Sequence, residues 1–350
     1  MFDDIGNRGC LCKQGIDAFG PGAFEIVAAR VSALTEGIKL FADARHQLSA
    51  HGVLNDRIAV VLNLGQPSSG TILHGPSRFA VMLSSGDSRR IQDGRENMLR
   101  SLENKVAWVT GAGTGIGEAG AIALAQAGMH VVLSGRRLEK LEEVASQCGD
   151  AVSIEMLDVA DRDAVTEVAQ RIIQTHGRID VLVASAGINV KERNWHNVSL
   201  DDWDSVIRID LDGAFYCCKA VLPTMKAQGE GLIINISSWA GKHVSVVTGP
   251  AYTAAKHAMN AMNESINMEA GLYGVRACAV CPGEVATPIL DNRPVPVSEK
   301  DRAQMVQPED CGELIKFLAQ MPNHVCINDL TISPTFNRGY VAQSRGLEKL

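Results

Sequence analysis

From about residue 100 onward, apolar and polar positions along this chain follow two alternating rhythms. Short runs rich in β-branched residues, such as KVAWVTG (105–111) and HVVLSG (130–135), predict strands that are buried on both faces. Longer stretches between them, such as RLEKLEEVASQCG (137–149), have the apolar spacing of amphipathic helices. Strands that alternate with helices in this way predict a parallel sheet covered by helices on both faces.

The same alternation continues along the chain and predicts about seven strands and six helices. The strands are expected at 105–111, 130–135, 151–159, 179–187, 231–238, 274–283 and 328–333, and the helices at 117–128, 137–149, 161–176, 201–228, 250–272 and 308–320. Sheets of this kind bind ligands at the carboxyl ends of their strands. We therefore expect the functional residues in the loops that follow the strands.

Residues 1–97 lack this rhythm. Their short apolar runs are separated by Pro, Gly and Ser, and the polar stretch 82–97 has the composition of a linker. We expect this N-terminal extension to be disordered or an over-extended translation, with Met98 as the real start; an authentic extension is the alternative. Residues 98–350 are expected to form a single domain, because they contain every element of the predicted sheet.

The composition narrows the choice of partners and compartment. The chain is 46% hydrophobic and 21% charged, as globular proteins are, and its net charge of −7 gives no reason to expect nucleic acid or a membrane surface as partner. No apolar run reaches the ~18 residues of a membrane span. Nine scattered cysteines suit a reduced, cytoplasmic location, and Cys10 and Cys12 lack further ligands, so no metal site is predicted.

A glycine-rich turn, TGAGTGIG (110–117), follows the first predicted strand and opens the first helix. Gly111, Gly115 and Gly117 allow positive φ angles and a close approach of backbone to ligand. Amide groups at a helix start suit an anionic pyrophosphate. A purely structural turn is the alternative, but the position between strand and helix favours a dinucleotide site.

The end of the second strand indicates which dinucleotide would bind. An acidic residue there binds the ribose hydroxyl of NAD, whereas an arginine suits the 2′-phosphate of NADP. Here the text is LSGRR, with Arg136 and Arg137 and no acid, which favours NADP over NAD. The alternative is a basic first turn of a solvated helix. Asp158, after the third strand, is predicted either to accept a hydrogen bond from the adenine amine or to cap the following helix.

A tyrosine and a lysine lie four positions apart in AYTAAKHA (251–258). In a helix, Tyr252 and Lys256 share one face, and an ammonium held near a phenol favours the phenolate. Such a phenol can exchange a proton with an alcohol or a carbonyl group. Taken alone, the spacing is more typical of an ordinary amphipathic helix with an exposed lysine.

With these pieces in order, residues 101–335 resemble the short-chain dehydrogenase/reductase family. The matching landmarks are TGAGTGIG (110–117), LDV (157–159), SAG (185–187), NISS (235–238), YTAAK (252–256) and PGEVAT (282–287). The resemblance implies a Rossmann-type doubly wound α/β fold, NAD(P) as cofactor and exchange between an alcohol and a carbonyl in a small-molecule substrate. It also implies a homodimer or homotetramer that pairs through the helices at 201–228 and 250–272.

The resemblance assigns roles to individual residues. Tyr252 would be the catalytic acid/base, Lys256 would favour its ionised form and hold the nicotinamide ribose, and Ser238 would bind the substrate oxygen. Ser237 is expected to point to the other face, because side chains alternate along a strand. The cofactor contacts are expected at Gly111, Thr114, Gly115, Ile116, Gly117, Arg136, Asp158, Val159, Ala186, Gly187, Tyr252, Lys256, Pro282, Gly283, Val285 and Thr287.

The chain departs from the family pattern at two positions. Ser185 and Asp210 each stand where the family usually has an asparagine. In the family, the asparagine at the position of Asp210 helps to hold a water molecule that leads protons to the lysine. An aspartate accepts hydrogen bonds but cannot donate one unless it is protonated. We therefore expect Asp210, as a member of the catalytic set, either to replace the asparagine with little consequence or to pair with Lys256 through water and alter the pH profile. The competing function is a cofactor-binding sensor or scaffold with little catalysis.

The substrate is weakly constrained by the sequence. Ile289, Leu290 and Val295, from the loop that is expected to cover the cleft, are candidates for an apolar pocket wall. Trp239 beside Ser238 and Trp195 after the fourth strand are further candidates, although each of these residues is equally suited to packing.

Overall fold

The computed structural model of the chain describes residues 99–344, without the side chain of Gln343. The expectations for residues 1–97, including those for Cys10 and Cys12, lie outside the described residues. None of the helices between residues 99 and 344 is long and apolar enough to cross a membrane.

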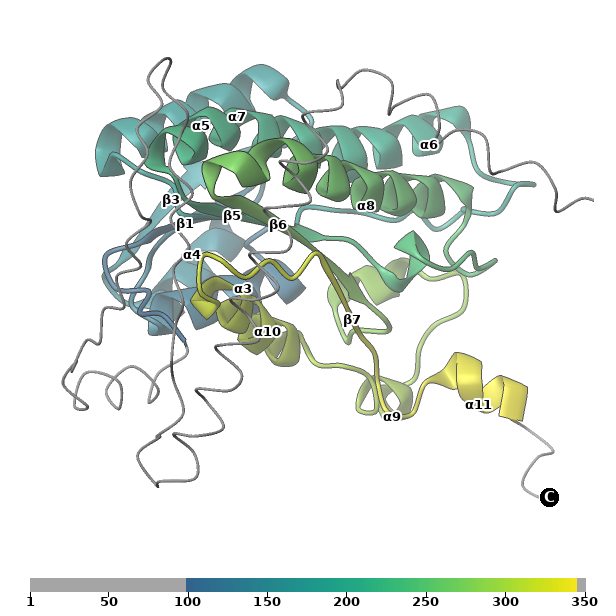
Figure 1. Cartoon of the computed structure of the whole chain (residues 1–350). Helices are drawn as coiled ribbons and strands as arrows, with labels where there is room; N and C mark the ends of the chain where they lie inside the picture. The colour runs from purple at the N-terminus through teal and green to yellow at the C-terminus, as the bar shows by residue number, and fades with distance from the viewer. Residues whose placement is uncertain (1–98, 345–350) are drawn as a thin grey trace, which may run out of the picture. The chain divides into compact units, whose positions relative to one another are not determined.

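A seven-stranded sheet forms the centre of the described part of the chain (Figure 1). Its strands are β1 (Val106–Thr110), β2 (His130–Gly135), β3 (Val152–Met156), β4 (Val181–Ala184), β5 (Gly231–Ile236), β6 (Val275–Pro282) and β7 (Asp329–Ile332). Every pair is parallel, and the order is β3-β2-β1-β4-β5-β6-β7. The predicted doubly wound parallel sheet is therefore confirmed, and the order reverses between β1 and β4.

Helices cover both faces of the sheet (Figure 1). One layer contains α3 (Gly115–Gln126), α4 (Leu138–Cys148) and α10 (Pro308–Gln320), and the other contains α5 (Arg162–His176), α6 (Leu200–Ile207), α7 (Gly213–Gln228) and α8 (Pro250–Ala270). Alternate strand residues enter the two layers: Ala107 and Val109 pack with Leu124 of α3, whereas Trp108 packs with Val168 of α5. This explains why the strands read as continuous apolar runs.

The structure departs from the expected elements mainly where the chain approaches the carboxyl edge of the sheet. The strands expected at 151–159 and 179–187 end early, at Met156 and Ala184, so that the residues after them form loops. Two short helices, α9 (Glu299–Arg302) and α11 (Arg338–Ser344), lie in segments where no helix was expected. Their apolar pattern is too short to be distinguished from that of a loop.

The single helix expected at 201–228 is interrupted. Between α6 and α7, the five residues Arg208–Asp212 form a π-helical turn. Asp210 lies in this turn and is fully buried. A π-helical turn is rare and often marks a functional site, and here it places a charged residue on the inner side of the layer.

Asp161, rather than Asp158, caps α5. The Asp161 side chain accepts hydrogen bonds from the amides of Asp163 and Ala164, whereas Asp158 accepts one from Ala160. The capping alternative for Asp158 is therefore wrong, and its carboxylate remains available on the carboxyl side of β3.

Glu230 joins several segments at the opposite, amino edge of the sheet. It accepts hydrogen bonds from Lys105 (2.5 Å), Asn323 (2.7 Å) and Arg178 (3.2 Å). The hydrogen bond from Lys105, helped by Asn323 and opposed by partial burial, lowers the pKa of Glu230 from 4.5 to about 2. Glu230 therefore links the residues that precede β1, β4 and β5.

We expect Glu230→Gln to lower the free energy of unfolding at pH 7 by about 2 kcal/mol. At about 1.4 kcal/mol per pKa unit the lowered pKa of Glu230 corresponds to ~3 kcal/mol, and solvent screening of the partly exposed side chain reduces this value. A lowered carboxyl pKa stabilises the fold above the unfolded value of 4.5, and this contribution is lost as the pH falls through about 2. Urea unfolding at several pH values should show that the difference in free energy of unfolding between the unmodified protein and Glu230→Gln becomes smaller below pH 4.5. In the control Glu313→Gln, which removes an exposed pair with Lys316, the loss should stay under about 0.5 kcal/mol. An equal loss in both variants would contradict the assignment.

Candidate active site

A cavity of about 750 Å³ opens at the carboxyl edge of the sheet. Loops that follow β1, β4, β5 and β6 line it, and the reversal of strand order between β1 and β4 lies within it. The chain connections that follow β1 and β4 run in opposite directions, so a crevice forms between the two loops. Sheets of this kind bind their ligands in that crevice.

The glycine turn after β1 forms one side of this cavity. Gly111 has φ = +65°, and a Cβ atom on it would lie 2.7 Å from the amide nitrogen of Ala186. Gly115 has φ = +64°, and its Cβ would lie 3.0 Å from a methyl carbon of Thr287. These two glycines therefore let the turn lie against the loops after β4 and β6.

Gly117 has a different position from the one predicted. It does not line the cavity, and a Cβ atom on it would lie 2.3 Å from the carbonyl oxygen of Gly111. Its role in the structure is to let α3 pack against the turn. Thr114 makes no side-chain cap at the start of α3, whose first amides lack partners within the helix. One of them, at Gly115, is bound by Glu118 at 3.2 Å.

Two arginines lie at the end of the cavity beside β2. Arg136 and Arg137 both line it, together with Asp158. The guanidinium of Arg136 is 3.9 Å from the Asp158 carboxylate, and Arg137 donates a weak hydrogen bond of 3.4 Å to Thr114. All three charged side chains are well exposed, so they are free to rearrange around a ligand.

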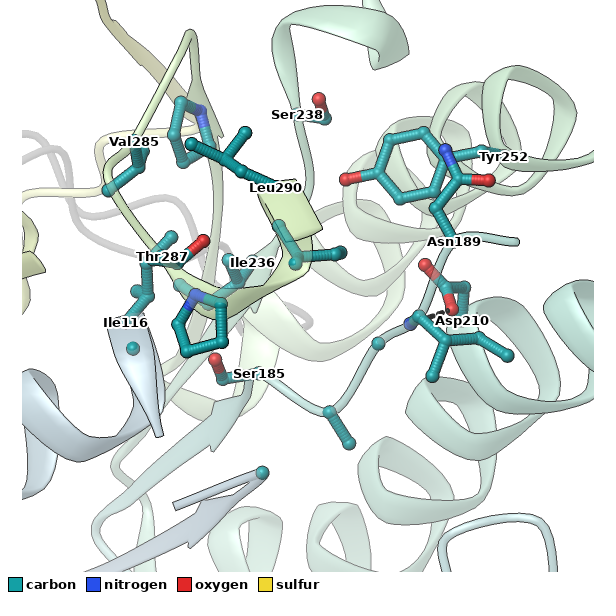
Figure 2. Close-up of a pocket in the computed structure, with 18 of the residues that line it drawn as sticks. Ile116, Ser185, Asn189, Asp210, Ile236, Ser238, Tyr252, Val285, Thr287 and Leu290 are labelled. Carbon is teal, nitrogen blue, oxygen red and sulfur yellow. Dashed lines mark hydrogen bonds between the residues drawn. The ribbon is translucent and has the colours of Figure 1, made fainter. Parts of the chain in front are cut away.

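Ser238 and Tyr252 lie on the same side of the cavity, across from Thr287 and Ile116 (Figure 2). Ser238 follows β5, and its oxygen accepts a hydrogen bond from the amide of Ala240, which leaves its own hydrogen free to donate. Ser237 is buried and donates instead to the carbonyl oxygen of Lys256. The two serines therefore have the opposite orientations expected from strand alternation.

Lys256 is buried beneath Tyr252. Its Nζ lies 5.3 Å from the centre of the Tyr252 ring and donates a hydrogen bond of 3.1 Å to the carbonyl oxygen of Ile236. The Asp210 carboxylate is 3.2 Å from the same nitrogen, and the two side chains are only 4% and 0% exposed. This is an ion pair and not a well-aligned hydrogen bond, because Asp210 Oδ2 has no aligned donor among residues 99–344.

Asp210 is held from the other side by the loop after β4. Its Oδ1 accepts a hydrogen bond of 2.8 Å from the amide of Ile188, drawn as a dashed line in Figure 2. A Cβ on Gly187 would lie 3.1 Å from Asp210 and 3.5 Å from Lys256, so a glycine leaves space for the pair.

The ion pair changes the acidity of both groups. Burial is the largest single effect and lowers the pKa of the Lys256 ammonium, but Asp210, together with Tyr252 and Cys281, outweighs it, and the pKa of Lys256 is raised. Burial raises the pKa of Asp210 above its usual value, and Lys256 and the Ile188 amide oppose this rise. Lys256 therefore remains an ammonium ion, with part of its field neutralised by Asp210.

The structure brings the predicted residues together in one cavity, with the exception of Gly117. The cavity is lined by Ser238, Tyr252, Lys256 and Asp210, and by Gly111, Thr114, Gly115, Ile116, Arg136, Asp158, Val159, Ala186, Gly187, Pro282, Gly283, Val285 and Thr287. Trp239, Ile289 and Leu290 also line it. Val295 and Trp195 do not line the cavity, and Trp195 is 82% exposed.

Several polar lining residues were missed by the sequence analysis. They are Asn189, Arg193, Glu284, Arg293 and Arg338. Arg293 and Arg338 both donate to Glu284, so that α11 is joined to the loop after β6. Only the position of Glu284 within PGEVAT offered a signal; Arg338 begins the unpredicted helix α11, and the other three lie in loops without a recognisable pattern.

The residues at this edge fit a dinucleotide. The turn of Gly111 and Gly115 provides a space that a Cβ would fill, the first amides of α3 suit a pyrophosphate, and the two arginines beside β2 suit a further phosphate.

Comparisons with known proteins agree with this geometry. The family model for short chain dehydrogenase matches residues 105–295, more than half of the chain. An uncharacterized oxidoreductase of Staphylococcus aureus (strain USA300) is 36% identical over 234 residues, which cover 67% of this chain and 98% of the relative.

Two solved structures have similar folds. A metagenomic short-chain oxidoreductase in complex with NADP is 32% identical with a TM-score of 0.59, and the match covers 67% of this chain and 99% of that one. The closed form of a serine dehydrogenase complexed with NADP+ is 31% identical with a TM-score of 0.61, and the match covers 66% and 95%. By its family match, its relatives and its fold, the chain belongs to the short-chain dehydrogenase/reductase family.

Proposed function

We propose that this protein is an NADP-dependent oxidoreductase that interconverts an alcohol and a carbonyl group, with Tyr252 as the acid/base. The observation that carries the proposal is the buried Lys256 ammonium beneath the Tyr252 ring, with Ser238 on the same side of the cavity. An ammonium at this position favours the ionised phenol and so makes it a better base. Membership of an oxidoreductase family supports the reaction class.

The chain's own residues account for the movement of the proton. In the oxidation direction, Ser238 donates its free hydrogen to the substrate oxygen, and Tyr252 accepts the proton of the substrate hydroxyl. In the reduction direction, Tyr252 returns that proton to the carbonyl oxygen. Bound NADP supplies the hydride donor or acceptor for this exchange.

The same residues suggest how the cofactor is held. Lys256 uses one N–H on Ile236 and has further N–H donors for the nicotinamide ribose. Arg136 and Arg137 are suited to the 2′-phosphate of NADP, and Asp158 to the adenine amine. The NADP in the two solved structures named above supports the preference over NAD.

Asp210 favours a second candidate function, a cofactor-binding sensor or scaffold with little catalysis. Its carboxylate neutralises part of the Lys256 charge on which the acid/base chemistry depends. The complete set of Ser238, Tyr252 and Lys256 in one cavity favours the enzyme. The effect of substituting Tyr252 separates the two functions, because only the enzyme needs the transferable proton.

Assembly and compartment stay predictions. A homodimer or homotetramer through α7 and α8 would use exposed apolar residues such as Phe215, which is half exposed on α7. Val206 and Met262, in contrast, pack into the fold's own core. A cytoplasmic location would suit the free thiols of the described cysteines.

We expect Tyr252→Phe to reduce turnover by at least about 10²-fold, because the ring remains but the transferable proton is lost. Initial rates should be measured with NADP(H) over a panel of alcohols and ketones. Cofactor affinity, measured by fluorescence titration, should change little. A variant that keeps full turnover would exclude Tyr252 as the acid/base, and a wild-type protein that binds NADP without any turnover would support the sensor.

We expect the protein to bind NADPH more tightly than NADH, and Arg136→Ala to narrow the difference by about tenfold, the loss of one charge-assisted hydrogen bond. Titration of both cofactors into both proteins measures the ratio. Arg162→Ala is the control, since Arg162 is exposed at the start of α5 and does not line the cavity. Equal affinities for NADPH and NADH in the unmodified protein would overturn the preference.

We expect Asp210→Asn to move the acid limb of the pH–rate profile for alcohol oxidation to lower pH by about one unit, the low end of the effect of a nearby charge. Removing the carboxylate leaves the Lys256 charge uncompensated, which favours the ionised phenol. The control is Asp212→Asn, two residues away and outside the cavity. An unchanged limb, or one displaced to higher pH, would show that the ion pair does not tune Tyr252.

A further inference from the structure

Arg193 is a buried cation at the substrate side of the cavity. It lies in the loop after β4, lines the cavity with Tyr252, and is only 5% exposed. It donates to the carbonyl oxygens of Val247 (3.4 Å) and Asn292, and thereby joins three loops around the substrate space. Its Nε has no hydrogen-bond partner among residues 99–344.

The charge of Arg193 is not compensated within the described residues. Of the other arginines on this side, Arg293 is paired with Glu284, and Arg338 with Glu284 and Asp301. No carboxylate of residues 99–344 lies within 4.0 Å of Arg193. Of these three arginines, Arg193 is therefore the one whose charge has no carboxylate partner in the described residues.

A buried guanidinium without a carboxylate partner is costly, and a ligand can lower that cost only where the guanidinium lines a cavity, as Arg193 does. Burial, together with the charge of Arg293, lowers the pKa of the Arg193 guanidinium, and the Tyr252 side chain opposes this effect. Arginine keeps its proton in proteins, so an anion bound in the cavity can match the charge of Arg193. A guanidinium fork fits a planar carboxylate, and a single excess charge matches a monoanion better than a phosphate dianion.

We infer that the substrate of this site carries a carboxylate that binds to Arg193, so that the substrates are small hydroxy acids and the corresponding oxo acids. The inference rests on the proposed function, because it takes the cavity beside Tyr252 as the substrate site. The adenosine end, with Arg136 and Arg137, is a separate part of the same cavity.

Arg276 provides an internal comparison. It too is buried, donates to backbone carbonyl oxygens of Pro322 and Val325, and has an Nε without a partner among the described residues. It lies on β6 and does not line the cavity. Its substitution therefore reports what the loss of a buried arginine does to the fold without removing a cation from the substrate space.

The test is calorimetric titration of the NADP+-saturated protein with butyrate and with its neutral counterpart butyramide. We expect butyrate to bind at least about tenfold more tightly, the effect of one charge-assisted hydrogen bond. Arg193→Met should remove this preference, Arg193→Lys should retain part of it, and Arg276→Met should retain all of it.

Several outcomes would overturn the inference. They are equal binding of butyrate and butyramide by the unmodified protein, no saturable butyrate binding at millimolar concentrations, and a preference that survives in Arg193→Met. The first two need no variant, so they apply even if Arg193→Met does not fold. If inorganic phosphate binds through Arg193 and butyrate does not, the inference that the ligand is a carboxylate would also be overturned.

The binding assay separates this inference from the proposed function. Turnover of neutral alcohols without a preference for butyrate would overturn the carboxylate site and leave the role of Tyr252 intact. Butyrate binding through Arg193 in a protein that turns over no hydroxy acid would leave the anion site standing and overturn the proposed reaction.

Discussion

The buried ion pair between Lys256 and Asp210 is the contact on which the catalytic side of the structure depends. Lys256 Nζ is bound to the carbonyl oxygen of Ile236, which fixes α8 to the end of β5. Asp210 accepts from the amide of Ile188, which fixes the π-helical turn to the loop after β4. Four segments of the chain are thus held around two charges. Removing one partner of such a pair leaves an uncompensated buried charge, so the pair constrains all four at once.

The geometry of the pair also sets the electrostatics around Tyr252. The Lys256 ammonium lies 5.3 Å from the centre of the Tyr252 ring, and the Asp210 carboxylate lies 3.2 Å from the same nitrogen. A neutral asparagine at position 210 would leave the ammonium at full strength. The aspartate therefore offsets part of the charge of Lys256 beside Tyr252, and the glycine at position 187 is the feature of the backbone that makes room for it.

Much of the fold could be predicted because its signals lie within single elements. The limits of β2 and α10 match their predicted ranges, and Ser237 and Ser238, which directly follow β5, bind different partners. Where the prediction was wrong, a local pattern was overridden by packing. The π-helical turn replaces a continuous helix, and Gly117 serves the contact of α3 with the glycine turn and not the cavity.

The sequence by itself determined the parallel sheet, the glycine turn after β1 and the spacing of Tyr252 and Lys256. These features follow from the regular repeat of strands and helices, which fixes where neighbouring side chains point. Only the tertiary structure decided that Asp210 contacts Lys256 directly and that Arg193 lines the same cavity as Tyr252. Arg193 and Asn292 lie 99 positions apart, and their contact depends on how separate loops pack at one edge of the sheet, which no local periodicity encodes.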